Sequence, residues 1–239
     1  ATNGITTVTG TFRNDGTNGG TIATITGANA STFIFGAGGI YEHALAGGTI
    51  PTSTWNATSI CKILGSVGAH PSGGGQAFGN MIYNCPGMNT NINMSSSMSV
   101  AGNLEILNTG TGFLVVGQAT LNVTGDCIVS DSFRLATTAR TLNITGDLIV
   151  NGGKFDLSAG NVVGTVNLTG DFYLTAGTIT ETSGGSGLIV FNNSNGIQNY
   201  TYTGGSISGV INFTVSSTVT LQMDSEGYLE GGGTCTLSS

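Results

Sequence analysis

Apolar and polar residues alternate in short runs along most of the chain. In residues 120–129 (TLNVTGDCIV), apolar Leu121 and Val123 alternate with polar neighbours, and the alternation resumes after a Gly-Asp pair. A period of two places successive side chains on opposite faces of a β-strand. The pattern therefore predicts two short strands, each with one buried face, joined by a bend at the Gly-Asp pair.

This two-strand unit is repeated. Residues 120–129 return as 141–150 (TLNITGDLIV) and 165–174 (TVNLTGDFYL), and a degenerate copy occupies 98–107. The bend glycines are Gly102, Gly125, Gly146 and Gly170. Glycine is expected there because it tolerates the positive φ that a sharp bend can require. A repeat of roughly 20 residues is typical of a solenoid, because one unit cannot bury its apolar side alone and must stack on its neighbours.

The repeat fits an all-β coil better than a leucine-rich repeat. A leucine-rich repeat needs a helix in each unit, whereas these units lack apolar residues at helical spacing and are rich in Gly, Thr and Asn. We therefore predict a right-handed parallel β-helix (β-solenoid), a single domain over residues 1–239, with two or three strands per coil and like residues stacked on like. Strand patterns at 20–27, 32–36 and 210–215 extend it toward both ends.

Residues 51–95 interrupt the repeat pattern. They contain all three prolines of the chain, its one tryptophan and two of its four cysteines. Prolines and clusters of turn-forming residues are typical of loops rather than of regular strands. We therefore predict that this stretch forms an irregular excursion beside the coils.

Composition and charge narrow the function classes. Of 239 residues, 38% are hydrophobic and 7% are charged, which is enough apolar material for a packed core. Only five residues are Lys or Arg and the net charge is −7, so we expect no nucleic-acid partner. The longest apolar runs are strand-sized, so we expect no membrane insertion. Because the chain begins at Ala1 and shows no signal peptide, we expect that an export signal has been removed or that the chain has been shortened.

Several short motifs distinguish the stretch before the coils. They are 41–43 (YEH), 47–56 (GGTIPTSTWN), 59–63 (SICKI), 76–80 (QAFGN) and 83–86 (YNCP). With the Gly-Asp coils that follow, they resemble a segment that recurs in very large surface proteins of Bacteroidetes. The resemblance implies export through the type IX route and a repetitive extracellular architecture. Such proteins are described as adhesin-like or as components of surface filaments.

The four cysteines have different expected roles. In an exported protein, Cys61 and Cys85, near the two ends of the excursion, are expected to form a disulfide bond. The alternative is a zinc site, for which only His70 lies inside the loop. Cys127 stands where the other repeats have Leu or Phe, so we expect a buried thiol. For Cys235, three alternatives stay open: buried, free, or linked to another chain.

Stacked coils would bring the bend aspartates Asp126, Asp147 and Asp171 to one corner. Repulsion between carboxylates about 5 Å apart would favour a bound Ca²⁺, for which these three residues are the candidate ligands. The alternative, which we favour, is that they cap the corner backbone and face water. No other cofactor is expected.

Three asparagines occupy equivalent positions on the expected outer face. Asn122, Asn143 and Asn167 each begin an Asn-x-Thr triplet. Such triplets accept glycans where the modifying enzymes exist. A ladder of amides that hydrogen-bond from coil to coil explains the same residues, and we favour the ladder.

Aromatic residues in and before the excursion are candidates for contact with a glycan. Tyr41, Trp55 and Tyr83, together with His43, would form an aromatic platform for a sugar ring. The alternative, which we favour, is that these side chains pack onto the adjoining coil.

Little in the sequence supports catalysis. Polysaccharide lyases and hydrolases built on β-helices need clustered carboxylates, or an Asp with a basic partner, in a groove. Arg134 and Arg140 follow Asp131 closely, and we expect a solvated loop pair. We therefore predict that the protein is not an enzyme.

Together, these features predict a secreted or cell-surface structural protein. It would be a rigid β-solenoid building block of an adhesin, a surface layer or a filament. The alternative is a carbohydrate-binding or polysaccharide-degrading β-helix. Because neither end shows an obvious cap, we expect end-to-end self-association or a longer parent chain, with surface glycans as candidate partners.

Overall fold

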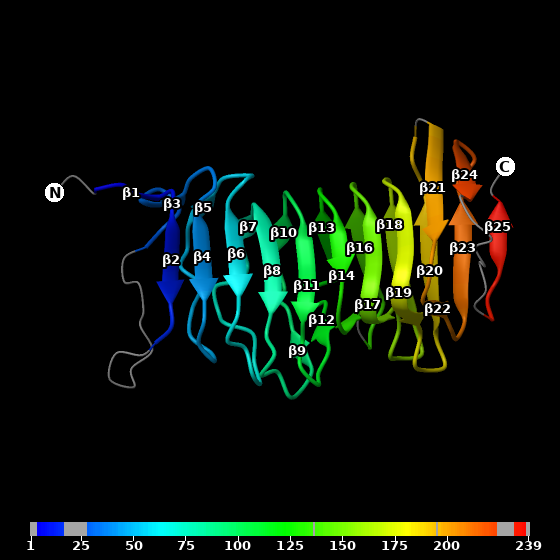
Figure 1. The fold of residues 1–239 in the computed structure, drawn as a ribbon, viewed down its shortest axis with the longest axis horizontal. Helices are drawn as coiled ribbons and strands as arrows, with labels where there is room; N and C mark the ends of the chain where they lie inside the picture. Colours follow the sequence, from blue (N-terminus) through cyan, green and yellow to red (C-terminus); the bar gives the residue numbers. More distant parts are fainter. Residues whose placement is uncertain (1–3, 17–27, 136, 195, 224–231, 238–239) are drawn as a thin grey trace.

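The fold is an elongated stack of β-strands. A computed structural model describes residues 4–16, 28–135, 137–194, 196–223 and 232–237 of the chain. These residues include no helix, and so none that could cross a membrane. Figure 1 shows the strands side by side along the longest axis, with β1 (Thr6–Val8) and β25 (Cys235–Leu237) at opposite ends.

The strands form three sheets. The three-stranded sheet contains β1, β3 (Phe33–Phe35) and β5 (Thr54–Trp55). The eight-stranded sheet contains β7 (Ala77–Phe78), β10 (Ser99–Val100), β13 (Thr120–Val123), β16 (Arg140–Ile144), β18 (Val163–Leu168), β20 (Ser186–Phe191), β23 (Ile211–Val215) and β25. The fourteen-stranded sheet contains β2 (Thr11–Asn14), β4 (Ile40–His43), β6 (Ile60–Ile63), β8 (Asn80–Asn84), β9 (Ile92–Asn93), β11 (Leu104–Asn108), β12 (Leu114–Val115), β14 (Cys127–Val129), β15 (Phe133–Arg134), β17 (Leu148–Asp156), β19 (Phe172–Thr180), β21 (Gly196–Tyr202), β22 (Ser206–Ile207) and β24 (Val219–Met223).

Each coil runs from one sheet to the next. In a central coil, β13 leads through the Gly-Asp corner to β14, and β15 follows as a short third strand. In the next two coils, the nine-residue strands β17 and β19 cover both of the later positions. The result is a parallel β-solenoid of about 9 turns, which confirms the predicted all-β coils with two or three strands each.

The repeats stack in register. Thr141 and Asn143 of β16 lie opposite Thr120 and Asn122 of β13, and the register continues into β18. Parallel strands of one sheet lie about 4.8 Å apart, so like residues stack directly on like, as predicted. The strands expected at 32–36 and 210–215 are found as β3 and β23. The strand expected at 20–27 lies outside the described residues.

Inward side chains form columns along the stack. One column of the fourteen-stranded sheet contains Tyr41, Cys61, Met81, Leu104, Cys127, Leu148, Phe172 and Tyr200, all of them buried. Cys127 occupies the position of Leu148 in the next coil, as predicted. Phe172 stacks on Tyr200 with ring centroids 4.9 Å apart. Burial of each large apolar side chain stabilises the fold by about 1.5–3 kcal/mol.

The excursion predicted for residues 51–95 is not found. This stretch contains β5 to β9, and β6 pairs in register with β4 on one side and with β8 on the other. The three prolines lie between strands, where the missing N–H removes no ladder hydrogen bond. Residues 51–95 therefore belong to the coils, and their loops rather than their strands carry the unusual composition.

The disulfide predicted between Cys61 and Cys85 is not formed. Both are buried free thiols. Cys61 of β6 lies opposite Met81 of β8, whereas Cys85 follows Met81 by four residues along the chain. Four residues of strand span roughly 13 Å, and a disulfide needs Cα atoms within about 7 Å of each other. The Cys85 thiol instead donates to the Ile63 carbonyl at 3.2 Å.

Close approach of coils, rather than positive φ, explains the corner glycines. Glycines with positive φ occur at other turns, such as Gly153 and Gly177, but the bend glycines of the repeat are not among them. A Cβ added to Gly146 would lie 2.5 Å from Asp126 Oδ1 and 2.5 Å from the carbonyl carbon of Gly125. The neighbouring coil therefore leaves no room for a side chain at this corner.

Candidate functional site

The Gly-Asp corner carries a continuous ladder of Asn and Asp side chains. In each step, a side-chain Oδ1 accepts a hydrogen bond of 2.8–2.9 Å from the backbone N–H at the same corner one coil further on. The members of this corner ladder are Asn80, Asn103, Asp126, Asp147, Asp171 and Asn199. The aspartates therefore cap the corner backbone, as favoured from the sequence, but each cap reaches into the neighbouring coil.

The corner ladder does not form a metal site. Within the described ranges, no group of three Asp, Glu, His or Cys side chains is placed to hold a metal ion, so the alternative of Ca²⁺ at Asp126, Asp147 and Asp171 is not supported. One oxygen of each carboxylate is already bonded to the next coil, and one carboxylate per coil gives a line rather than a shell of ligands. Desolvation and, to a smaller extent, the charges of Asp126 and Asp171 raise the pKa of Asp147, while the hydrogen bond from the Asp171 N–H opposes the rise.

The three outer-face asparagines form a second ladder. The Asn143 amide donates to Asn122 Oδ1 at 2.8 Å, and the Asn167 amide donates to Asn143 Oδ1 at 2.8 Å. This confirms the amide ladder. The same side chains that would have to be free to accept glycans are engaged in linking coils.

The candidate aromatic platform does not form, and the side chains pack into the coils, as favoured from the sequence. Tyr41 is 0% exposed, Trp55 is 9% exposed and Tyr83 is 2% exposed. Trp55 stacks on Phe35 with ring centroids 4.3 Å apart. These rings point into the solenoid because each lies at an inward position of its strand, so no surface platform forms.

Two tyrosine–histidine pairs, each with a buried tyrosine, lie in the N-terminal coils. His43 Nε2 lies 2.6 Å from the Gly47 carbonyl, and Nδ1 lies 2.9 Å from the Tyr41 hydroxyl. Because a carbonyl only accepts, Nε2 carries the proton and Nδ1 accepts from the tyrosine. His70 uses the opposite tautomer: Nδ1 donates to the Pro71 carbonyl at 2.7 Å and Nε2 accepts from Tyr83 at 2.8 Å. Burial lowers the pKa of both histidines, so both are neutral at pH 7.

Arg134 is part of a shielded ion pair rather than of a solvated loop pair. Its Nε donates to Asp156 Oδ2 at 2.8 Å, and the side chains are 14% and 0% exposed. The guanidinium carbon lies 3.9 Å from the centroid of the Phe113 ring. Thr182 also donates to Asp156 Oδ2, at 2.7 Å. Arg134 therefore pairs with Asp156 of the neighbouring coil rather than with Asp131, which is close to it in the sequence.

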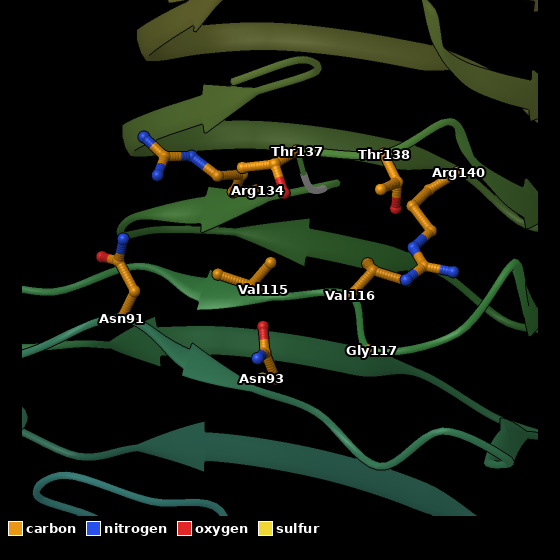
Figure 2. Close-up of a pocket in the computed structure, with 9 residues that line it drawn as sticks. All are labelled: Asn91, Asn93, Val115, Val116, Gly117, Arg134, Thr137, Thr138 and Arg140. Atoms are coloured by element: carbon orange, nitrogen blue, oxygen red, sulfur yellow. The ribbon is translucent and has the colours of Figure 1, made fainter. Parts of the chain in front are cut away.

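A pocket of about 320 Å³ lies on the side of the solenoid formed by β9, β12 and β15. Figure 2 shows Val115 and Asn93 in its middle, with the Arg134 guanidinium toward Asn91 on one side and the Arg140 guanidinium beside Val116 on the other. The residues that line it include two arginines, two asparagines and two threonines, and none is an acid. The pocket therefore presents hydrogen-bond donors over an aliphatic floor.

The other cations of the N-terminal coils face a carboxylate. Arg13 and Lys62 both contact Glu42, at 2.9 and 3.3 Å. The hydrogen bond from Arg13 is the main cause that lowers the pKa of Glu42. Arg140 forms no ion pair with any described residue, and its buried Nε has no hydrogen-bond partner among them. Arg140 is thus a half-buried cation whose charge no described residue neutralises.

Sequence reasoning missed this pocket because its parts come from three successive coils. Asn91, Val115 and Arg134 lie on strands or loops about one repeat apart. The available signal was the scarcity of cations: two of the five occur within seven positions of each other in a central coil. Whether these two arginines line one pocket depends on which way each side chain points. The repeat pattern, which would predict that direction, is weakest in this part of the coil.

The fold and these sites define the class of the protein: a parallel β-solenoid with a polar ladder at one corner and a basic pocket on one side. The sequence matches no family model, and neither a curated protein nor a solved structure is significantly similar to it. The function is therefore argued from the chemistry of the chain itself.

Proposed function

We propose that the chain is a non-enzymatic structural protein, a stiff right-handed β-solenoid rod in an extracellular adhesin, surface layer or filament. The observation that carries the proposal is the use of polar side chains to link one coil to the next. Six residues of the corner ladder and three outer-face asparagines hydrogen-bond along the axis.

The acidic side chains support the same role. Asp126, Asp147 and Asp171 each cap the next coil, and Asp156 pairs with Arg134 of the preceding coil. Such contacts add to backbone pairing on both sides of each interior strand. A molecule connected in this way at the Gly-Asp corner, on the outer face of one sheet and in its core resists bending, which suits a spacer or a building block.

The edges of the terminal strands support assembly along the axis. Among the described residues, no strand pairs with the outer edge of β2 or of β24. Exposed strand edges offer unpaired N–H and C=O groups to another chain. We propose end-to-end self-association, or continuation of the solenoid in a longer chain, as the way in which the rod is extended.

The extracellular location rests on the sequence resemblance of residues 41–86. Type IX export and a place on the cell surface follow from it as proposals, with surface glycans as candidate partners. Protease treatment of intact cells tests the location: the protein should be cleaved or released from the surface, whereas full protection inside the cells would contradict it.

Electron microscopy combined with an activity assay tests the structural role. Purified protein should appear as rods, or as fibres whose axial rise per coil is about 4.8 Å. In parallel, the protein is incubated with neutral and acidic polysaccharides, and the release of reducing ends is measured over time. Rods without turnover are expected. Release of reducing ends in proportion to protein concentration would replace the structural role by the polysaccharide-degrading alternative.

A further inference from the structure

The pocket on the β9, β12 and β15 side is positive although the chain as a whole is acidic. The net charge of the chain is −7, with only five Lys and Arg residues. Two of those five line this one pocket, and no acid does. Asp156 compensates Arg134 from outside the set of lining residues, so the uncompensated charge belongs to Arg140.

Arg140 lines the pocket with a guanidinium that has an unsatisfied N–H group. It begins β16, where its backbone lies opposite Gly164 of β18. Its side chain is half-buried, its Nε is shielded from solvent, and no described residue accepts a hydrogen bond from that atom. A shielded guanidinium N–H without an acceptor costs free energy, which an anion in the pocket would recover.

The remaining lining groups suit hydroxyls and a ring. Asn91 uses its Oδ1 to accept from the Phe113 N–H at 3.0 Å, so its amide N–H groups are left as donors. Asn93, Thr137 and Thr138 add further donors and acceptors around the aliphatic side chains of Val115 and Val116. The volume of about 320 Å³ is at the lower end of the ~300–1,000 Å³ that is usual for small-molecule sites. One sugar ring fits this range.

From this geometry we infer that the pocket binds an acidic sugar residue, a hexuronate whose carboxylate pairs with the Arg140 guanidinium. The planar guanidinium matches a carboxylate with two parallel hydrogen bonds. The C–H groups of the ring pack over Val115, and the ring hydroxyls hydrogen-bond to the asparagines and threonines. This inference is independent of the proposed structural role, because a rod can carry such a site or lack it.

Calorimetric titration of the whole protein with D-glucuronate tests the inference. D-Glucose and sodium sulfate are titrated under the same low-salt conditions. Saturable binding of glucuronate is expected. Glucose, which lacks the carboxylate, and sulfate, which lacks the sugar ring, should each bind at least about tenfold more weakly. Failure of glucuronate to bind overturns the inference. Sulfate that binds as tightly as glucuronate overturns the assignment to a sugar.

Variants locate the binding. Arg140→Gln keeps amide donors but removes the charge, and should weaken glucuronate binding roughly tenfold or more. Lys154→Gln is the matched control, because Lys154 is exposed and lies outside the pocket. Asn93→Ala, at an exposed position of β9, should weaken binding severalfold. Equal weakening by Arg140→Gln and Lys154→Gln would place the binding elsewhere and overturn the inference.

Discussion

At the scale of the residue, the corner ladder needs an acceptor oxygen rather than a charge. Asn80 and Asn103 occupy steps equivalent to those of Asp126, Asp147 and Asp171, and all five accept the same hydrogen bond at Oδ1. At Asp126 and Asp147, the charge therefore adds repulsion without adding a hydrogen bond along the ladder. The raised pKa of Asp147, the middle member, reflects desolvation first and its two charged neighbours after that.

Replacement of Asp147 by Asn should stabilise the protein at pH 7. The variant keeps the Oδ1 acceptor and removes the ionised carboxylate, and we expect a gain of about 0.5 kcal/mol because solvent screens the repulsion. A raised folded-state pKa means that the wild-type protein recovers stability as the pH falls through that pKa, which lies above 3.8. The gain from the substitution should therefore vanish at pH 3, as measured by urea denaturation at both pH values.

A second acid gives the matched control. Glu105 lies on the outer side of β11, between Ile82 and Ile128 of the neighbouring strands, so Glu105→Gln removes one charge away from the corner ladder. Its effect should be smaller at pH 7. An Asp147→Asn gain that is equally large at pH 3 would show that relief of charge repulsion is not its cause.

The free thiols make a prediction about redox conditions. Burial raises the pKa of Cys61 well above its usual range, and raises the pKa of Cys127 to about 12. Addition of a reductant should leave the melting temperature unchanged. A disulfide between Cys61 and Cys85 would instead contribute roughly 3 kcal/mol to the free energy of unfolding, and the reductant would remove it. The thiols of Cys61 and Cys127 should react with a maleimide only after the protein unfolds. A lower melting temperature in the reductant would contradict the described arrangement of Cys61 and Cys85.

At the scale of the element, the coil corner is set by contact between backbones. Gly125, Gly146 and Gly170 each face the backbone of the preceding coil so closely that an added Cβ would meet its atoms. The corner therefore requires glycine in these three repeats, although none of the three has a positive φ. The close approach of successive coils therefore explains why glycine recurs at this spacing in the sequence.

Gly146→Ala should destabilise the solenoid by about 1–3 kcal/mol, because the new methyl group overlaps backbone atoms that have no free space to move into. Gly68→Ala is the control: nothing lies within 4 Å of its added Cβ, so the substitution should be neutral or slightly stabilising. Chemical denaturation of both variants measures the difference. Equal effects would mean that the coils separate at the corner at little cost.

The elements differ in how well the sequence predicts them. Strands β13, β16 and β18 were predictable residue by residue, because the same residue types recur and stack. The coils of 51–95 were not, because β6 lies one coil of 20 residues after β4 and lacks the Gly-Asp corner signature. The side-chain alternation of Ile60–Ile63 was visible, but the prolines nearby obscured it.

The sites were less predictable than the strands. The amide ladder follows from alternation and register alone, so Asn122, Asn143 and Asn167 could be placed from the sequence. The Arg134–Asp156 pair could not, because it joins two coils at a point where β17 continues past its bend. The packing of Tyr41 and Tyr83 onto the coil, favoured from the sequence, is found because both lie at inward positions of their strands.

At the scale of the whole molecule, different kinds of titratable side chain lie in different coils along the axis of the solenoid. The N-terminal coils contain both histidines, each bonded to a buried tyrosine, whereas the corner aspartates lie in the central coils. Each coil contacts mainly its neighbours, so stability is close to a sum of local terms. A change of pH should therefore act on different coils with different sign.

The N-terminal coils should loosen first on mild acidification. Burial lowers the folded-state pKa of His43 and His70 below the usual 6.5, and each ring also depends on a neutral nitrogen to accept from its tyrosine. The stability that these histidines contribute is complete above pH 6.5 and is lost as the pH falls through their folded-state values. Each adds a slope of up to about 1.4 kcal/mol per pH unit in that range.

Hydrogen exchange measured by mass spectrometry locates this effect. After correction for the intrinsic rate, peptides from β4, β6 and β8 should lose protection between pH 7 and pH 5, whereas peptides from β16 and β18 should keep theirs. His70→Gln, which retains a donor and an acceptor but does not titrate, should reduce the loss in β8, where Tyr83 lies. Loss of protection spread evenly over all coils would mean that the rod opens as one cooperative unit, and the coil-by-coil account of its stability would be wrong.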